Sequence, residues 1–262
     1  MKLEGKRVII TGASSGIGLE LLKLLLEKGC TVVASARSIE KLDLSEPKLY
    51  LRKCDVSKKE ELDGLFAYSL EKMGGLDLFI ANAGFAYFEK IDKPDWEHIE
   101  AIFETNVVSF IYCAEKMKEL NGSKPYNFVV TASGMSLLSI PGYSLYSGTK
   151  AAIRGFADAY RFELAKGQHF QVVYPIATKT KFFSRAGNNT PVPWPTQTAD
   201  VVARSIIGGI QKNQKRIFPS KVFYMTNLIN RILPFINILY VNIYNRQFQK
   251  WLQTSKQKGE KL

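Results

Sequence analysis

Short apolar runs alternate along the chain with longer stretches in which apolar residues recur every three or four positions. The short runs have the length of strands, and the periodic stretches have the spacing of amphipathic helices. Six strands are predicted, at residues 7–11, 31–35, 49–53, 76–81, 127–132 and 170–174. Helices are predicted between and after them, at residues 17–28, from 57 to about 73, and at 96–120, 144–165 and 198–211. Ser57 and Glu60 have the spacing of a capping box at the start of the second helix.

Alternating strands and helices indicate parallel strands joined by crossover helices, which cover both faces of the sheet. The predicted fold class is therefore α/β: a Rossmann-like, doubly wound parallel sheet in three α/β/α layers. We expect a single catalytic domain over residues 1–211, followed by a helical C-terminal extension over residues 212–262. The segment 182–198 is predicted to be a long loop, and loops of that length often cover a site.

A glycine-rich segment, residues 11–18, lies between the first predicted strand and the first predicted helix. Glycines there let the main chain turn sharply and approach a pyrophosphate, while the helix N-terminus presents unpaired N–H groups. The spacing differs from the Gly-x-Gly-x-x-Gly pattern of many dinucleotide-binding loops. The position nevertheless favours a nucleotide site. Its candidate contacts are Gly12, Ser14, Ser15, Gly16, Ile17 and Gly18.

The end of the second predicted strand indicates which dinucleotide is bound. The segment from Ala34 to Ser38 contains Arg37 and no carboxylate. In dinucleotide-binding folds an acidic residue there binds the 2′-hydroxyl of NAD, whereas an arginine accommodates the 2′-phosphate of NADP. A guanidinium can also contact a phosphate in bidentate fashion. The sequence therefore predicts NADP(H) as cofactor, with Arg37 at the 2′-phosphate.

Tyr146 and Lys150 are four residues apart in a predicted helix, so their side chains lie on one face. An ammonium held near a phenol stabilises the phenolate. At an effective dielectric near ~20, a charge about 4 Å away is worth up to ~4 kcal/mol, or about three pKa units. Such a shift would let Tyr146 exchange a proton near neutral pH.

Further positions surround this pair in a fixed order. They are Asp55, the run Asn82-Ala83-Gly84, Asn106, Ser133 thirteen residues before Tyr146, and the segment 175–180. Together with the glycine segment, they make the chain resemble the short branch of the short-chain dehydrogenase/reductase family. The resemblance is detailed over residues 3–180 and looser to about 211. The chain departs from the family at Ala81, where many members have Asn, and at Ile176, where Gly is usual.

The resemblance implies a role for each position. Tyr146 is expected to act as the acid in reduction or the base in oxidation, and Ser133 to donate a hydrogen bond to the substrate oxygen. Lys150 is expected to bind the nicotinamide ribose and lower the pKa of Tyr146, and Asn106 to hold a water linking Lys150 to solvent. The other implied cofactor contacts are Asp55 and Val56 at the adenine, Asn82, Ala83 and Gly84 at its ribose, and Pro175, Thr178 and Thr180 toward the nicotinamide. No metal site is expected.

The residues predicted to face the substrate are mostly apolar or aromatic. They are Met135, Tyr143 and Phe183, with Leu137, Leu138, Phe182 and Trp194 beside them. This composition favours a lipophilic carbonyl or alcohol over a sugar. The alternative, that half of these residues belong to the hydrophobic core and do not face the substrate, is nearly as well supported.

The net charge of +12 is concentrated at the C-terminus. The last 51 residues hold ten Lys and Arg against one acid, Glu260, which gives +9. Apolar residues recur there at three- and four-residue steps, from Val222 to Leu252. Two interpretations stay open: a basic amphipathic helix that lies on an anionic bilayer, or an element that covers the substrate pocket or forms a dimer contact. The aliphatic character of the segment argues against nucleic acid as partner.

Cysteine usage and hydropathy bear on the compartment. Cys30, Cys54 and Cys113 are few and widely spaced, which argues against a disulfide framework and fits a reducing environment. The N-terminus lacks the pattern of a signal peptide, and no apolar run reaches the roughly 18–20 residues of a spanning helix. We expect a cytoplasmic location, peripheral at the cytoplasmic face of a membrane if the C-terminal segment binds lipid.

The expected function is that of an NADPH-dependent oxidoreductase that reduces a ketone or aldehyde, or oxidises the corresponding alcohol, on a hydrophobic, lipid-like substrate. One alternative is a reductase of 3-oxoacyl thioesters. Another is a non-catalytic NADP(H)-binding regulator, against which the complete Ser133, Tyr146 and Lys150 set argues. We expect a homodimer or homotetramer.

Overall fold

The computed structural model describes residues 1–233 and 235–257, without the side chain of Ile236. At its centre seven parallel strands form one sheet in the order β3-β2-β1-β4-β5-β6-β7. The strands are β1 (Arg7–Thr11), β2 (Thr31–Ala36), β3 (Leu49–Lys53), β4 (Leu78–Ala81), β5 (Asn127–Thr131), β6 (His169–Val173) and β7 (Arg216–Ile217). The chain reverses its direction of winding between β1 and β4. At such a switch point, the carboxyl ends of the strands border a crevice.

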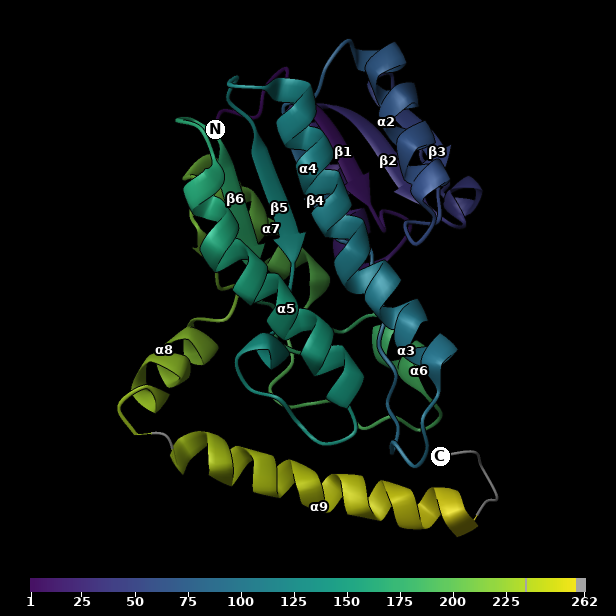
Figure 1. The fold of residues 1–262 in the computed structure, drawn as a ribbon, viewed down its shortest axis with the longest axis vertical. Helices are drawn as coiled ribbons and strands as arrows, with labels where there is room; N and C mark the ends of the chain where they lie inside the picture. The colour runs from purple at the N-terminus through teal and green to yellow at the C-terminus, as the bar shows by residue number, and fades with distance from the viewer. Residues whose placement is uncertain (234, 258–262) are drawn as a thin grey trace.

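Helices cover both faces of the sheet (Figure 1). One face carries α1 (Gly16–Glu27) and α7 (Ala199–Gln211), and the other carries α2 (Lys59–Met73), α4 (Ser109–Asn121) and α5 (Ser144–Tyr160). In β1, Ile9 packs toward the second group of helices, while Val8 and Ile10 pack toward the first, and all three are fully buried. A strand buried on both sides needs no polar alternation, which explains its uninterrupted apolar run. The predicted three-layer, doubly wound fold is confirmed.

Shorter elements connect these layers. α3 (Trp96–Phe103) continues into α4 through a π-helical segment, Glu104–Val108. Three 3₁₀ turns lie at Ile39–Lys41, Gly134–Ser136 and Arg161–Glu163. The last of these follows α5, which therefore ends earlier than predicted.

Three further features differ from the prediction. The strand β7 was not predicted because it has only two residues, and it extends the sheet past the proposed domain boundary at residue 211. The segment predicted as a loop over 182–198 begins with a short helix, α6 (Phe182–Ala186). The capping box is wrong: α2 begins at Lys59 without a side-chain cap, because the Ser57 hydroxyl donates instead to Asp55 Oδ1 at 2.9 Å.

The C-terminal extension is helical, as predicted, and consists of α8 (Lys221–Asn230) and α9 (Phe235–Gln257). Figure 1 shows α9, in yellow, crossing the end of the molecule toward which the strands point. Within residues 1–233 and 235–257, no helix combines the length and apolar character that crossing a bilayer requires.

Candidate active site

Ser133, Tyr146 and Lys150 come together beyond the carboxyl end of β5. Ser133 precedes the 3₁₀ turn Gly134–Ser136, and Tyr146 and Lys150 lie one turn apart in α5, which packs against that turn. The Lys150 amine is 5.6 Å from the centre of the Tyr146 ring. All three residues are at most 8% exposed. The set predicted from spacing is therefore assembled in one enclosed place.

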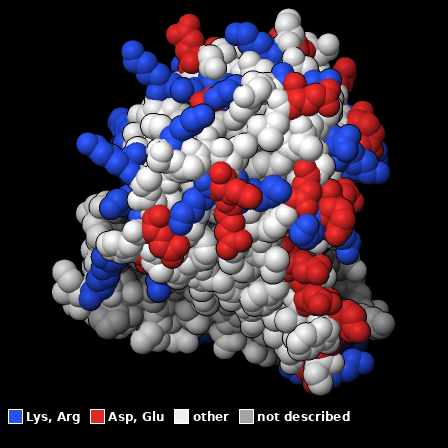
Figure 2. Space-filling view, turned by 45° about the horizontal axis from the view of Figure 1, so that its top comes forward, with Lys and Arg blue, Asp and Glu red and all other residues white. Residues whose placement is uncertain are grey.

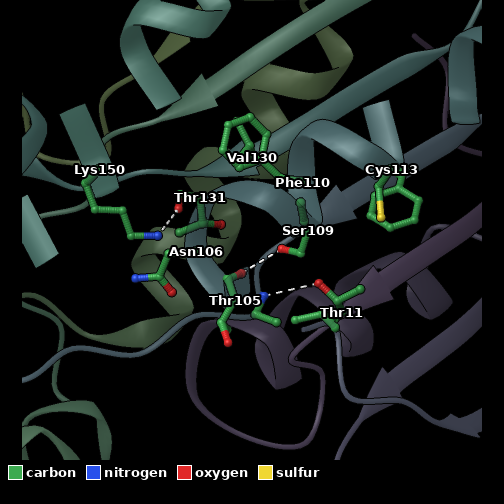
Figure 3. Close-up of a pocket in the computed structure, with 13 residues that line it drawn as sticks. Thr11, Thr105, Asn106, Ser109, Phe110, Cys113, Val130, Thr131 and Lys150 are labelled. Atoms are coloured by element: carbon green, nitrogen blue, oxygen red, sulfur yellow. Dashed lines mark hydrogen bonds between the residues drawn. The ribbon is translucent and has the colours of Figure 1, made fainter. Parts of the chain in front are cut away.

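Asn106 and Lys150 lie side by side at one end of a small pocket (Figure 3). The Lys150 amine donates to the Thr131 carbonyl at 2.8 Å. The Asn106 amide donates to the carbonyl of Phe85 at 2.8 Å and to Thr149 Oγ1 at 3.1 Å, and its oxygen accepts from the N–H of Phe85 at 3.1 Å. Asn106 sits in the π-helical segment, a local irregularity that is frequent at functional sites. These direct contacts of Asn106 position the main chain after β4. Its expected role in holding a water between Lys150 and solvent stays a prediction.

Burial dominates the electrostatics of the tyrosine and the lysine. It lowers the pKa of Lys150 to about 7, and it raises the pKa of Tyr146 to about 12, against the opposing effect of a hydrogen bond with Ser133. The expectation that Lys150 lowers the pKa of Tyr146 is therefore not met in the chain alone. The reason is that the amine bonds to the Thr131 carbonyl and both side chains are withdrawn from water.

The glycine segment has the shape that a phosphate cradle requires. Gly12 and Gly16 have φ of +66° and +58°. A Cβ at Gly12 would lie 2.9 Å from Ala83 Cα, and a Cβ at Gly18 would lie 2.1 Å from the Gly12 carbonyl oxygen. Ser15 precedes α1 but makes no side-chain cap, which leaves the first N–H groups of the helix for an external acceptor. The residues present therefore fit a dinucleotide pyrophosphate.

Asn82 follows β4 and forms hydrogen bonds with residues at the ends of β1 and β5, beside this crevice. Its main-chain N–H donates to Thr11 Oγ1 at 3.2 Å, and its side-chain amide donates to the carbonyls of Thr11 and Gly12, each at 3.4 Å. Its side-chain oxygen accepts from Thr131 Oγ1 at 3.2 Å. Because this side chain is engaged by β1 and β5, Asn82 positions the glycine segment. Ala83 approaches Gly12 closely, and Gly84 faces Asn106 and Lys150.

The predicted adenine side is more open. Arg37 follows β2 directly and is exposed, without an ion-pair partner among the residues that the structure describes. Asp55 is half-buried, with one oxygen occupied by the N–H and the hydroxyl of Ser57. Val56 is buried and lines the small pocket. These three residues border one side of the crevice, at the ends of β2 and β3.

The segment after β6 closes the opposite side. The Pro175 carbonyl accepts from the N–H of Gly134 at 2.7 Å, which joins the segment to the Ser133 turn. Thr178 is buried and donates to the Ile176 carbonyl at 2.9 Å. The Thr180 methyl would lie 3.0 Å from a Cβ at Gly16, and its hydroxyl accepts from the N–H of Phe182 at 3.2 Å. Thr180 therefore bridges the glycine segment and α6.

An apolar enclosure surrounds Tyr146. Met135, Tyr143 and Phe183, all predicted to face the substrate, are buried in the same cluster, and the Phe182 ring lies 5.5 Å from that of Tyr146. Leu137 packs elsewhere, in the core cluster that includes Phe218, and Leu138 is outside the enclosure. The structure does not place Trp194 in the enclosure: the residue is 77% exposed, and its carbonyl accepts a hydrogen bond from Tyr240 Oη.

Other residues of the enclosure were not predicted individually, although a cover from the C-terminal segment was one of the two interpretations left open. Phe88 lies between Tyr143 and Trp251, with ring centres 4.9 and 4.7 Å away. Tyr244, Trp251 and Leu252 of α9 are buried beside them. The spacing of the aromatic residues in α9 places them on one face of the helix and could have indicated a buried face. No local pattern predicts that this face packs against Phe88.

Comparisons with known proteins agree with this geometry. The family model for short chain dehydrogenases matches residues 6–190, which hold all the catalytic and cofactor candidates. The 11-beta-hydroxysteroid dehydrogenase 1A of Arabidopsis thaliana is 28% identical over 261 residues, covering 88% of this chain and 73% of the relative. The 3-ketodihydrosphingosine reductase of Dictyostelium discoideum is 29% identical over 254 residues, covering 82% and 75%.

Solved structures share the fold. A short chain dehydrogenase from Burkholderia cenocepacia, in complex with NADP, superimposes with a TM-score of 0.77 at 22% identity, covering 91% of this chain and 99% of that one. The family model spans most of the chain and includes the assembled Ser133, Tyr146 and Lys150. The chain therefore belongs to the short chain dehydrogenase family and is an oxidoreductase acting on CH–OH and C=O groups.

Proposed function

We propose that the chain interconverts a ketone or aldehyde and the corresponding alcohol on a hydrophobic, lipid-like substrate, with NADP(H) as cofactor. The observation that carries this proposal is the apolar enclosure around Tyr146. Its walls come from the turn after Ser133, from α6 and from α9, and they are aromatic or aliphatic. Such walls favour an alkyl or ring system over a hydroxylated substrate. The two relatives named for a hydroxysteroid and for 3-ketodihydrosphingosine, both lipids, support the same substrate class.

The proposed roles follow from the hydrogen bonds that each side chain leaves open. Ser133 Oγ accepts from the N–H of Met135 at 3.1 Å, which leaves its own proton for Tyr146 or for a substrate oxygen placed beside both hydroxyls. Tyr146 gives its phenolic proton to that oxygen in reduction and takes it back in oxidation. A nicotinamide held beside these side chains would supply the hydride in reduction and accept it in oxidation.

Lys150 completes the proton path. One of its donors is used on the Thr131 carbonyl, which leaves the others for ribose hydroxyls. Because burial places its pKa at about 7, the amine can hold or release a proton near neutral pH. Asn106 bonds to the N–H and the carbonyl of Phe85 and thereby fixes the adjoining Gly84, which faces this amine.

A chain-length series tests the proposed substrate class. Medium- and long-chain ketones and aldehydes are offered to the enzyme, and NADPH oxidation is followed by absorbance. We expect kcat/KM to rise by up to about fourfold per added methylene for as long as the added methylenes pack against these apolar side chains, since each buried methylene is worth about 0.8 kcal/mol. Higher kcat/KM for sugars or for the shortest carbonyls would contradict the proposal. Preference for a 3-oxoacyl thioester over a free ketone of equal length would favour the thioester reductase instead.

Arg37 is expected to select NADP(H) over NAD(H). Arg37→Asp should raise the Kd for NADPH by about 10- to 100-fold, because the charge-assisted bonds to the 2′-phosphate are lost and a repulsive carboxylate is introduced. The Kd for NADH should change by less than about threefold. Fluorescence titration measures both constants. Lys41→Asp, which reverses a nearby exposed charge, is the matched control. Equal changes for the two nucleotides would show that Arg37 does not contact the 2′-phosphate.

A further inference from the structure

The two sides of α9 differ in their contacts. Its inner side contributes Tyr244, Trp251 and Leu252 to the enclosure around Tyr146. Hydrogen bonds from this side fix the helix to the segment after α6: Tyr240 Oη to the Trp194 carbonyl at 2.8 Å, Tyr244 Oη to that of Pro191 at 3.1 Å, and Trp251 Nε1 to that of Asn188 at 3.0 Å. The inner side of α9 is therefore packed against the enclosure and the segment after α6 of the same chain.

The outer side leaves large apolar side chains in water. On α8, α9 and the turn between them, the apolar platform comprises Met225, Ile229, Ile232, Ile238, Leu239 and Ile243, each between 43% and 81% exposed. The two helices are joined by a hydrogen bond from the N–H of Asn237 to Asn230 Oδ1 at 3.0 Å. An exposed apolar surface on adjoining helices marks an interaction site more often than plain solvent contact.

The charges around the platform are of one sign. No Asp or Glu occurs between residues 201 and 259, whereas α8, α9 and the turn carry Lys221, Arg231, Arg246, Lys250 and Lys256. Leu239, Ile243, Arg246 and Lys250 follow one another at four- and three-residue steps, so the cations continue the apolar stripe along the same side of α9. On the face shown in Figure 2, by contrast, acidic and basic side chains are intermixed.

We propose that the apolar platform docks on the surface of an anionic lipid bilayer, with α9 lying in the plane of the interface. Apolar side chains then reach the acyl boundary while lysines and arginines meet the anionic headgroups. A second copy of the chain is a poorer occupant, because a two-fold contact between identical platforms would oppose cations to cations without an intervening acid. The inference concerns attachment and does not depend on the proposed substrate.

Cosedimentation of the full chain with lipid vesicles tests the proposal. The wild type should bind vesicles of mixed phosphatidylglycerol and phosphatidylcholine more tightly than vesicles of phosphatidylcholine alone. A variant carrying Ile238→Gln, Leu239→Gln and Ile243→Gln should lose at least about tenfold in partitioning, because its apolar area no longer enters the interface. Arg246→Gln with Lys250→Gln should lose about fivefold per removed cation on the mixed vesicles only.

The matched control is Phe162→Gln, which removes an apolar side chain 92% exposed outside the platform and should leave partitioning unchanged. Thermal unfolding and NADPH titration verify that every variant is folded, since all the replaced side chains face water. Equal partitioning of the platform variant and the Phe162→Gln control would overturn the proposal. A wild type that does not bind the mixed vesicles would also overturn the proposal. If that wild type is a dimer in sedimentation equilibrium and the platform variant is a monomer, a second copy of the chain occupies the platform instead.

Discussion

Tyr146→Phe is expected to lower kcat by about 10³-fold while changing the Kd for NADPH by less than about threefold. The substitution removes only the phenolic oxygen, which in the proposed reaction exchanges the proton with the substrate. The ring stays in the enclosure, so packing against Phe182 and the position of Lys150 are retained. Steady-state turnover with the best substrate of the chain-length series, together with fluorescence titration of NADPH, measures the two effects separately.

Tyr143→Phe is the matched control. Tyr143 is fully buried in the same cluster, its ring centre is 6.1 Å from that of Tyr146, and its hydroxyl has no hydrogen-bond partner within the described residues. Loss of that hydroxyl should therefore leave kcat within about threefold. Turnover that survives Tyr146→Phe, or falls equally in both variants, would remove Tyr146 from the mechanism.

Gly18→Ala is expected to weaken NADPH binding by at least about 100-fold and to lower the midpoint of thermal unfolding. The added Cβ would lie 2.1 Å from the Gly12 carbonyl oxygen and 2.7 Å from Asn82 Nδ2. The first of these neighbours is main chain, so relief of the clash must move the turn that approaches the pyrophosphate. Titration with NADPH and a thermal melt without nucleotide separate the loss of binding from the loss of stability.

Gly208→Ala provides the comparison, because Gly208 lies within α7 and a Cβ added there would meet no neighbouring heavy atom within 4 Å. That variant should gain up to about 1 kcal/mol of stability from helix propensity and bind NADPH normally. A Gly18→Ala protein with unaltered affinity would mean that the glycine segment does not cradle the phosphates.

The sequence predicts well what local chemistry determines. The glycines of residues 12–18 are demanded by positive φ and by close main-chain approach, and Tyr146 and Lys150 share a face because four residues make about one helical turn. The strand β1 was recognisable because burial on both faces leaves an unbroken apolar run. These features depend on neighbours in sequence, so their pattern is visible without coordinates.

The remainder depends on contacts between distant segments. Met135 and Leu137 are two residues apart and both apolar, yet the first faces Tyr146 and the second packs near Phe218. Ser57 matched a helix cap, but the Asp55 carboxylate competed for its hydroxyl. The pKa of Tyr146 follows total burial rather than spacing to Lys150, and burial is a property of the whole fold.

The hydrogen bonds between α9 and the carbonyls of Asn188, Pro191 and Trp194 have a mechanical consequence. Tyr146 and Ser133 are enclosed, so a substrate reaches them only when part of the wall formed by α6, the following segment and α9 gives way. Side chains of α9 donate hydrogen bonds to three carbonyls of the segment after α6. We therefore expect this segment and α9 to move together unless those hydrogen bonds break. We therefore expect that a partner bound to α9 also changes the rate at which substrate enters the site.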